Sequence, residues 1–293
     1  MLRLMSDAAA ANPIRNVSDT ALWVAIYRAM ESERPDAIFN DPYARRLGGE
    51  RGEAIVSSMK GGEAFAWPMI VRTAVMDEVL LRCIEQGATT VLNLAAGLDT
   101  RPFRLPLPAS LRWFHVDLPP MIDYVRERLE GAKPRCILEY IAADLTDATQ
   151  RREAFAKAGG RGPVLVIAEG LLIYLTPEQV AGLADELHAF PDMRWWLIDL
   201  ASPDLLKRLA KQWGGNLASA NADFRFAPAE GTAFFAPHGW RESEFRSTWE
   251  ESLRLDRHMR FARFFNLLSK LAPKAKREAG RRMSGIVLFE RTE

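Results

Sequence analysis

The sequence predicts an α/β fold with a Rossmann-like, mostly parallel β-sheet, and two observations carry this prediction. Between residues 89 and 200, short apolar runs alternate with stretches whose apolar residues recur at helical spacing. Such alternation is typical of a parallel sheet that helices cover on both faces. Small or acidic residues directly follow four of the apolar runs, as expected at the sheet edge where ligands bind.

The predicted strands are short runs of apolar, β-branched and aromatic residues. They span Thr89–Leu94, Leu111–Val116, Cys136–Ala142, Val164–Ala168, Arg194–Leu200 and Gly285–Phe289. The helices predicted between them span Met121–Leu129, Thr149–Ala158 and Pro177–Phe190.

Helices are also predicted before the sheet. Ser18 suits the N-cap of a helix over residues 21–30, and Pro42 suits the first turn of a second helix. A third helix, over residues 64–86, is expected to end at Gly87. After the fifth strand, Pro203–Phe235 breaks into aromatic and Gly/Asn/Ala-rich pieces that predict an insertion over the ligand-binding edge.

The chain is nearly neutral, with 39 Lys and Arg against 38 Asp and Glu. No overall field therefore attracts nucleic acid or an anionic membrane, and we predict neither as a partner. The basic run from Lys270 to Arg282 lacks the interleaved aromatic residues of nucleic-acid sites, so a solvated helix or loop is expected there. The oligomeric state stays open.

Two cysteines, Cys83 and Cys136, belong to no CxxC pair and to no Cys/His cluster, so neither a metal site nor a disulfide framework is expected. No apolar run reaches the roughly 18–20 residues of a membrane helix. Met1–Ala11 lacks the apolar stretch of a signal peptide. These features together predict a cytoplasmic protein.

The residues at the strand ends predict a ligand. Ala95-Ala96-Gly97 follows the first strand, where small residues let a ligand approach the backbone. Asp117 follows the second strand and can accept hydrogen bonds from a ribose diol, while Asp144 follows the third and can reach an adenine amino group. Glu169 follows the fourth strand, and three converging acids suit a cationic ligand.

S-adenosylmethionine has the matching groups: a diol, an adenine, an ammonium and a sulfonium. It also has a carboxylate, for which Arg72 in the preceding helix is a candidate bidentate partner. The sequence therefore predicts S-adenosylmethionine as the cofactor.

Two long motifs, with shorter matches around them, resemble the leucine carboxyl methyltransferase family, including bacterial members similar to tetracenomycin-type polyketide O-methyltransferases. The motifs are Asn93–Leu105 and Ala168–Leu175, and the shorter matches are Thr20–Leu22, Glu31–Tyr43, Val71–Thr73 and Asp117–Pro119. The resemblance covers roughly residues 16–200. It implies a class I methyltransferase sheet of seven strands, with the last strand antiparallel.

The resemblance also implies roles for individual residues. Arg72 matches the arginine that holds the methionine carboxylate, and Asp117 matches the ribose ligand. Asp144 and Leu145 match the adenine contacts, and Glu169 matches the acid near the methionine amino group. The full set expected to bind the cofactor is Arg72, Ala95, Gly97, Asp117, Leu118, Asp144, Leu145 and Glu169.

The chain departs from the family pattern at two positions. Ala95 stands where the family usually has glycine, which is expected to be tolerated if its φ stays negative. Asn40 lies where the eukaryotic branch has a lysine near its Asp-Pro, which argues against a protein C-terminus as the methyl acceptor. A small molecule such as a polyketide-like metabolite is therefore the predicted acceptor.

Few groups in the sequence can act as a base. A carboxylate acceptor, with a pKa of about 4, needs none, whereas a phenol with a pKa of about 10 would benefit from one. Among the histidines, His115 is expected in the core, His188 on an exposed helix, and His258 is undecided. The candidates for orienting or deprotonating the acceptor are Tyr174 and His238. This scarcity favours a carboxylate and leaves a hydroxyl open.

Five aromatic residues are expected to shape an apolar acceptor pocket: Trp213, Phe224, Phe226, Phe234 and Phe235. The predicted organisation is one methyltransferase domain, divided into a helical N-terminal cap (1–87), a cofactor-binding core (88–202), a lid or substrate insertion (203–250) and a C-terminal part that completes the sheet (251–293).

Two other functions match parts of the sequence pattern. An NAD(P)-dependent oxidoreductase would have Gly-x-Gly-x-x-Gly after the first strand, but Ala95–Thr100 lacks two of these glycines. A non-catalytic nucleotide-binding module would have no use for the full set of residues at the strand ends.

Overall fold

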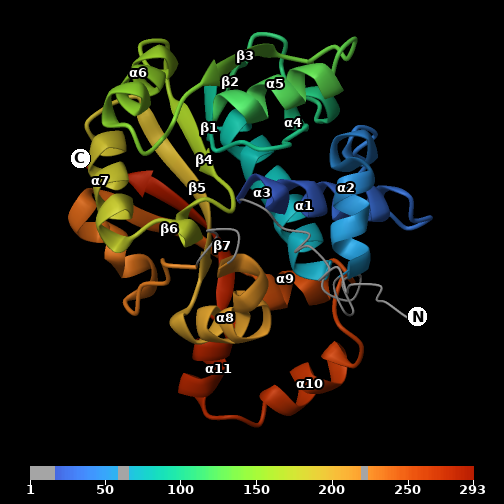
Figure 1. Ribbon diagram of the computed structural model, residues 1–293. Helices are drawn as coiled ribbons and strands as arrows, with labels where there is room; N and C mark the ends of the chain where they lie inside the picture. The colour runs from blue at the N-terminus through green and yellow to red at the C-terminus, as the bar shows by residue number, and fades with distance from the viewer. Residues whose placement is uncertain (1–16, 59–65, 219–223) are drawn as a thin grey trace, which may run out of the picture.

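The computed structural model describes residues 17–58, 66–218 and 224–293 and contains a seven-stranded sheet with the order β3-β2-β1-β4-β5-β7-β6. Strands β1 to β5 are parallel, and β7 runs antiparallel between β5 and β6 (Figure 1). The predicted class I methyltransferase sheet, including its antiparallel last strand, is confirmed.

The strands are β1 (Thr90–Leu94), β2 (Arg112–Asp117), β3 (Ile137–Ala142), β4 (Val164–Ala168), β5 (Met193–Ala201), β6 (Trp240–Ser247) and β7 (Ser284–Arg291). The helices are α1 (Val17–Ser32), α2 (Ala44–Ser58), α3 (Trp67–Glu85), α4 (Arg101–Arg104), α5 (Pro119–Arg128), α6 (Ala148–Ala158), α7 (Pro177–His188), α8 (Pro203–Ala218), α9 (Thr248–Arg254), α10 (Ala262–Ser269) and α11 (Lys274–Arg281). Two 3-10 helices also occur, η2 (Leu172–Tyr174) and η3 (Gly231–His238).

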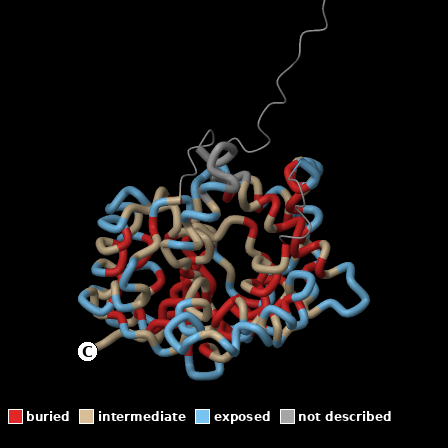
Figure 2. Tube along the Cα trace, turned by 90° about the horizontal axis from the view of Figure 1, so that it is seen from below, coloured by how far each residue is buried: buried red, intermediate tan, exposed pale blue. Residues whose placement is uncertain are grey.

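Helices bury both faces of the sheet. On one face, α3 packs its apolar side against alternate residues of the strands, with Trp113 and Trp195 in that layer. On the other face, α6 and α7 pack against the remaining strand residues, such as Phe114 and Trp196. A third apolar cluster joins α1 and α2 to α5. Figure 2 shows the buried residues gathered in the sheet and against it, with exposed residues mainly in the outer connections.

The last third of the chain contains the strand predicted at Gly285–Phe289, within β7, but other parts of the prediction there were wrong. Strand β6 was not predicted, because Trp240–Ser247 is an edge strand with four charged residues and therefore no apolar run. Helix α8 occupies Pro203–Ala218, within the stretch Pro203–Phe235 whose aromatic and Gly/Asn/Ala-rich pieces predicted an insertion without regular helices. His238, which the sequence places in a loop, is the last residue of η3.

The antiparallel strand β7 brings late parts of the chain to the edge where the parallel strands end. Ala201 at the end of β5 pairs with Ser284 at the start of β7, and Ser247 at the end of β6 pairs with Gly285. Helices α8, α9 and α11 therefore all lie at the carboxyl edge of β5, the edge that binds ligands in such sheets. Among the described residues, no helix combines the length and apolar character needed to cross a bilayer.

Candidate methyl-donor site

A cavity of about 1930 Å³ lies at the carboxyl edge of the parallel strands. It is larger than the roughly 300–1,000 Å³ that one drug-sized ligand occupies, so it has room for a cofactor and an acceptor together. All the residues predicted to bind the cofactor line it: Arg72, Ala95, Gly97, Asp117, Leu118, Asp144, Leu145 and Glu169. The structure thus brings together residues that are almost 100 positions apart in the sequence.

The turn after β1 has an unusual backbone. Gly97 has φ +52°, as expected for glycine, but Ala95 also has a positive φ of +48°. The negative φ under which an alanine was expected to be tolerated here is therefore not present. The Cβ of an alanine in this left-handed region costs roughly 1–2 kcal/mol, so the chain keeps the shape of the glycine turn against local strain.

Asp117 connects this turn to the end of β2. Its Oδ2 accepts a hydrogen bond from Gly97 N at 2.7 Å, and its Oδ1 accepts one from Leu118 N at 2.7 Å. Burial raises the pKa of Asp117, and the two backbone hydrogen bonds partly oppose that effect. Because a carboxylate has about four lone-pair positions, Asp117 can still accept hydrogen bonds from a diol.

Asp144 and Leu145 begin the loop after β3. The Asp144 Oδ1 accepts hydrogen bonds from Thr146 N at 2.8 Å and from Thr146 Oγ1 at 2.7 Å. These bonds fix the turn and leave Oδ2 for another donor. Arg151 from α6 donates a hydrogen bond to the Leu145 carbonyl at 2.6 Å, which ties the same loop to α6.

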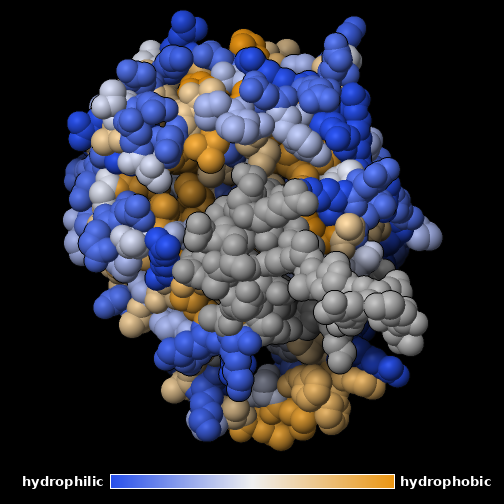
Figure 3. All heavy atoms as spheres, viewed as in Figure 1, coloured by the Kyte–Doolittle hydropathy of each residue, from blue (hydrophilic) through white to orange (hydrophobic). Residues whose placement is uncertain are grey.

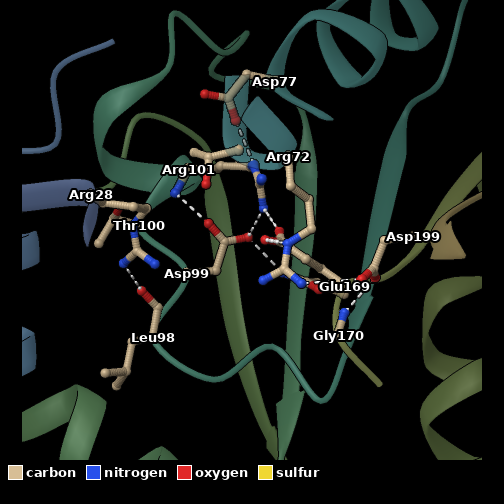
Figure 4. Close-up of polar contacts among 12 residues, drawn as sticks. Arg28, Arg72, Asp77, Leu98, Asp99, Thr100, Arg101, Glu169, Gly170 and Asp199 are labelled. Carbon is tan, nitrogen blue, oxygen red and sulfur yellow. Dashed lines mark hydrogen bonds and ion pairs between the residues drawn. The ribbon is translucent and has the colours of Figure 1, made fainter. Parts of the chain in front are cut away.

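An ion-pair network forms the wall beside the ends of β1 and β4 (Figure 4). Glu169 lies between two guanidinium groups, with Arg101 Nη1 at 2.8 Å and Arg72 Nε at 2.9 Å. Arg72 Nη1 also contacts Asp199 Oδ2 at 3.1 Å, and Gly170 N donates to Asp199 Oδ1 at 2.6 Å. These contacts use two nitrogens of Arg72, and the remaining donor nitrogen can serve a carboxylate.

Arg101 is the centre of the network. Its side chain is 3% exposed and contacts Asp77 at 2.6 Å and Asp99 at 3.0 Å in addition to Glu169. Asp99 also accepts a hydrogen bond from Asn93 in β1 at 2.7 Å. The turn after β1 is therefore held to α3 and to the end of β4 by charged contacts that are largely shielded from water.

A second layer of the network ties α1 to the same turn. Arg104 donates two hydrogen bonds to Asp77, and Arg28 pairs with Asp41 at 2.8 Å and donates to the Leu98 carbonyl at 2.7 Å. Thr100 donates to the same Asp41 carboxylate at 2.6 Å. The two layers together contain four arginines and five acids: Arg28, Arg72, Arg101, Arg104, Asp41, Asp77, Asp99, Glu169 and Asp199. With every group ionised, one negative charge is unbalanced.

The charges around Glu169 decide its protonation. Burial would raise the pKa of this carboxyl group, but Arg101 and Arg72 outweigh burial and lower the pKa to about 2. Glu169 is therefore ionised at neutral pH despite its environment. Within the described part of the chain, no group of His, Cys, Asp and Glu side chains is arranged to hold a metal ion.

A sequence model of the leucine carboxyl methyltransferase family matches residues 21–188, which is more than half of the chain. The chain belongs to the leucine carboxyl methyltransferase family. This confirms the resemblance found in the sequence motifs and makes the protein a methyltransferase.

Relatives and solved structures agree with this membership. A Parafrankia protein named as an inferred S-adenosyl-L-methionine-dependent methyltransferase is 34% identical over 257 residues, 79% of either chain. A Mycobacterium tuberculosis protein with the same description is 38% identical over 174 residues, 55% of this chain and 58% of the relative. Both names give S-adenosylmethionine as the methyl donor, as the sequence predicted.

Two crystal structures share the fold. One is a DUF574 family protein from Streptomyces avermitilis, with a TM-score of 0.57, 15% identity and coverage of 92% of this chain and 97% of that one. The other is an inferred methyltransferase from Thermobifida fusca, with a TM-score of 0.57, 15% identity and coverage of 99% and 100%.

Some residues expected near the acceptor lie elsewhere. None of the four histidines lines the cavity. His238 pairs with Asp185 of α7 at 2.8 Å, and His188, expected to be exposed, is half-buried and contacts the Thr292 carbonyl at 3.1 Å. His115 is buried, as expected, and its Nε2 lies 3.1 Å from the Gly97 carbonyl. His238 therefore has no place in the proposed site.

The predicted aromatic wall is confirmed only in part. Phe224 and Phe226 line the cavity, and Phe224 packs against Tyr174 with ring centroids 5.8 Å apart. Phe234 and Phe235 pack into the core around Trp196 and Phe289 and do not line it. The side chain of Trp213 lies outside the described residues.

Proposed function

We propose that this chain is an S-adenosylmethionine-dependent O-methyltransferase that methylates a carboxylate, or a hydroxyl, of a small molecule such as a polyketide-like metabolite. The observation that carries the proposal is the meeting of the strand-end residues with Arg72 in one cavity that is large enough for two ligands. Family membership and the descriptions of the relatives support S-adenosylmethionine as the donor.

The charge of the site fits this donor. S-adenosylmethionine carries an ammonium, a sulfonium and a carboxylate, so its net charge is positive, while the arginine–acid network has one excess negative charge. The pyrophosphate of NAD(P) would instead lie at the turn after β1, where Ala95–Thr100 lacks two glycines of the phosphate-binding loop and includes the acidic Asp99. The electrostatics of the cavity therefore favour the methyl donor over a dinucleotide.

Each cofactor role is assigned to one part of the cavity. We assign the ribose diol to Asp117, the adenine to Asp144 and Leu145 with Leu118 beside it, and the methionine carboxylate to Arg72. The ammonium group is assigned to Glu169, which is ionised and 17% exposed. We assign the backbone of the turn at Ala95 and Gly97 to direct contact with the cofactor.

When bound, the cofactor supplies a methyl group on a positively charged sulfur, which is already a good leaving group. The protein then has to align the acceptor oxygen with the methyl group, and such orientation contributes on the order of 7–11 kcal/mol. In this chain the rigid network around Arg101 holds the donor end, and Phe224, Phe226 and Tyr174 form the wall beside it.

The lining of the cavity favours an acceptor that is already ionised. No imidazole faces it, and burial raises the pKa of Tyr174, so that this phenol donates a hydrogen bond at neutral pH rather than removing a proton. A carboxylate needs no base, whereas a hydroxyl acceptor would lose the roughly 10²–10⁴-fold that a base supplies. We assign to Tyr174 the orientation of the acceptor oxygen.

Two broader assignments complete the proposal. We treat the chain as one catalytic domain in which residues 203–250 contribute to the acceptor side of the cavity. We place it in the cytoplasm, because its two cysteines are free and buried rather than paired.

Calorimetry with S-adenosylmethionine and, separately, with NAD tests the donor. We expect saturable heat with the first and none with the second. Incubation with methyl-labelled donor and paired acceptors, an aryl carboxylate and its phenol analogue, then tests the acceptor. Absence of donor binding by folded protein would refute the proposal, and faster labelling of the phenol would refute the preference for carboxylates.

A further inference from the structure

The far part of the cavity, beyond α8 and α9, differs from the cofactor end in charge. It is lined by residues of α8 and α9 and by the segment 259–283, which carries α10 and α11. In Figure 1 this segment lies at the bottom of the molecule, with α8 and α9 between it and the sheet. The pairing of Ala201 with Ser284 brings its end to the carboxyl edge of β5.

This segment concentrates positive charge. Between Met259 and Met283 the chain has eight Lys and Arg residues and one Glu, although the whole chain is nearly neutral. Overall neutrality therefore conceals a strong separation of charge, and the rest of the chain is net acidic. An expectation based on total charge alone could not detect this basic region.

Several of these cations lack a partner. Five basic side chains that line the far part of the cavity form no ion pair with any residue that the structure describes: Arg208, Lys270, Lys274, Lys276 and Arg277. Neighbouring Arg281, by contrast, contacts Glu278 and Glu250. Unpaired cations gathered at one wall produce a local field that attracts anions.

Apolar residues also line this part of the cavity. Leu205 and Leu209 of α8, Leu253 of α9, Met259 and Phe265 line the same cavity. The cavity thus combines methyl-donor residues at the strand ends, apolar side chains on α8 and α9, and cations on the segment 259–283. Figure 3 shows apolar atoms at the bottom of the molecule where α10 lies, beside hydrophilic atoms over α11.

We propose that the far part of the cavity binds an anionic group of the methyl acceptor, so that the acceptor is an elongated amphiphile. Its methyl-accepting oxygen lies at the cofactor end, its apolar body along the wall of α8 and α9, and its anionic end among the unpaired cations of 270–277. This inference rests on the proposed transfer to a small molecule and adds the chemical class of that molecule.

A charge-reversal pair tests the assignment. Lys274→Glu with Lys276→Glu changes two unpaired cations on α11, a helix with no buried residues, so the fold is expected to survive. Lys133→Glu with Lys157→Glu is the matched control, because both side chains are exposed, lie outside the cavity and change the total charge equally. Neither pair touches a residue assigned to the donor.

Calorimetry on each variant saturated with S-adenosylhomocysteine uses decyl phosphate and the neutral decyl maltoside, both below their micellar concentrations. We expect the Kd of decyl phosphate to rise about tenfold or more in the α11 pair. It should change less than about twofold in the control pair, and decyl maltoside should bind all three proteins equally. An unchanged Kd for decyl phosphate in the α11 pair would overturn the proposal.

Two further probes separate the sources of the anion. If inorganic phosphate binds as tightly as decyl phosphate, the far part of the cavity is a simple anion site. That result would overturn the proposal that the acceptor is an amphiphile. Binding to phosphatidylglycerol vesicles, without binding of monomeric decyl phosphate, would show a membrane-docking surface and also overturn the cavity assignment. S-adenosylhomocysteine binding is measured first in every variant, so failure of the donor site is distinguished from failure of the far site.

Discussion

The two ends of the cavity stabilise charge in opposite ways. At the cofactor end, charged groups are buried and paired, as in the contacts of Arg101 with Asp77, Asp99 and Glu169. At the far end, lysines such as Lys274 and Lys276 are exposed and have no acidic partner in the described structure. The first arrangement is preorganised for one ligand of fixed shape, and the second leaves its charges available to whatever anion enters.

The cofactor end is called the paired end, because its charged groups are paired. Arg101→Ala should cause the largest loss of stability there. The change leaves three acids without their shared cation in a site with little water, so we expect a loss of about 3–5 kcal/mol in the free energy of unfolding. Urea denaturation of both proteins at pH 7 measures it.

The control for this change is Arg45→Ala. Arg45 contacts Glu33 at 2.6 Å, but both side chains are about half exposed. Its loss should therefore cost less than about 1 kcal/mol. Similar losses in the two variants would show that burial adds nothing to the Arg101 network.

Acid should weaken the paired end through Glu169. Its pKa is about 2 in the folded chain, compared with 4.5 for a free glutamate side chain. Since the folded pKa is depressed, the stabilisation is complete above pH 4.5 and is lost as the pH falls towards 2. The shift corresponds to about 3 kcal/mol.

Glu169→Gln sharpens this test. The variant should be less stable than the natural chain at pH 7, and the difference should shrink between pH 4.5 and pH 3. Urea midpoints for the two proteins at several pH values measure the difference. A gap that stays constant over this range would mean that the charge of Glu169 does not stabilise the network.

Asp117→Asn should mainly reduce donor binding. The amide keeps one oxygen acceptor for the backbone donors but loses the charge and one acceptor. We expect affinity for S-adenosylmethionine to fall at least about tenfold, since hydrogen bonds to charged groups contribute roughly 1.5–3 kcal/mol. Calorimetry measures the affinity, and thermal unfolding measures the stability, which should fall by about 1 kcal/mol.

Asp147→Asn is a close control, because Asp147 also accepts two backbone hydrogen bonds, from Thr149 N and Gln150 N, but lies outside the cavity. It should lose similar stability and no affinity. Equal affinities of the Asp117 and Asp147 variants would make Asp117 a structural residue only.

The sequence predicted the paired end better than the far end, for physical reasons. Strands β1, β2, β4 and β5 are largely buried and apolar, so these strands and the residues at their ends were visible in the sequence. Strand β6 has a charged pattern, and the cations of α11 gain their meaning only because β7 returns antiparallel beside β5. The partners of Arg101 were also missed, since Asp77 and Glu169 lie on separate elements whose approach the sequence does not show.

The smallest expected effect concerns the turn itself. Ala95→Gly should remove the strain of a Cβ at φ +48° and so stabilise the fold by roughly 1–2 kcal/mol. Glycine also makes the unfolded chain more flexible, which lowers the stability by about 0.4–1 kcal/mol. A net gain between zero and about 1.6 kcal/mol in the free energy of unfolding is therefore expected. Urea denaturation at pH 7 measures it.

Ala96→Gly is the natural comparison, because Ala96 is the next residue, is equally half-buried and has no positive φ. Its replacement should lower the free energy of unfolding by roughly 0.5–1 kcal/mol, because glycine loses more conformational entropy on folding and relieves no strain there. A gain in stability at Ala95 with a loss at Ala96 would show that surrounding contacts hold the backbone of the turn after β1 in shape. The main contacts are the hydrogen bond from Gly97 N to Asp117 and the ion pair of Asp99 with Arg101. Losses at both positions would mean that Ala95 is unstrained, and that its departure from the family's glycine carries no cost.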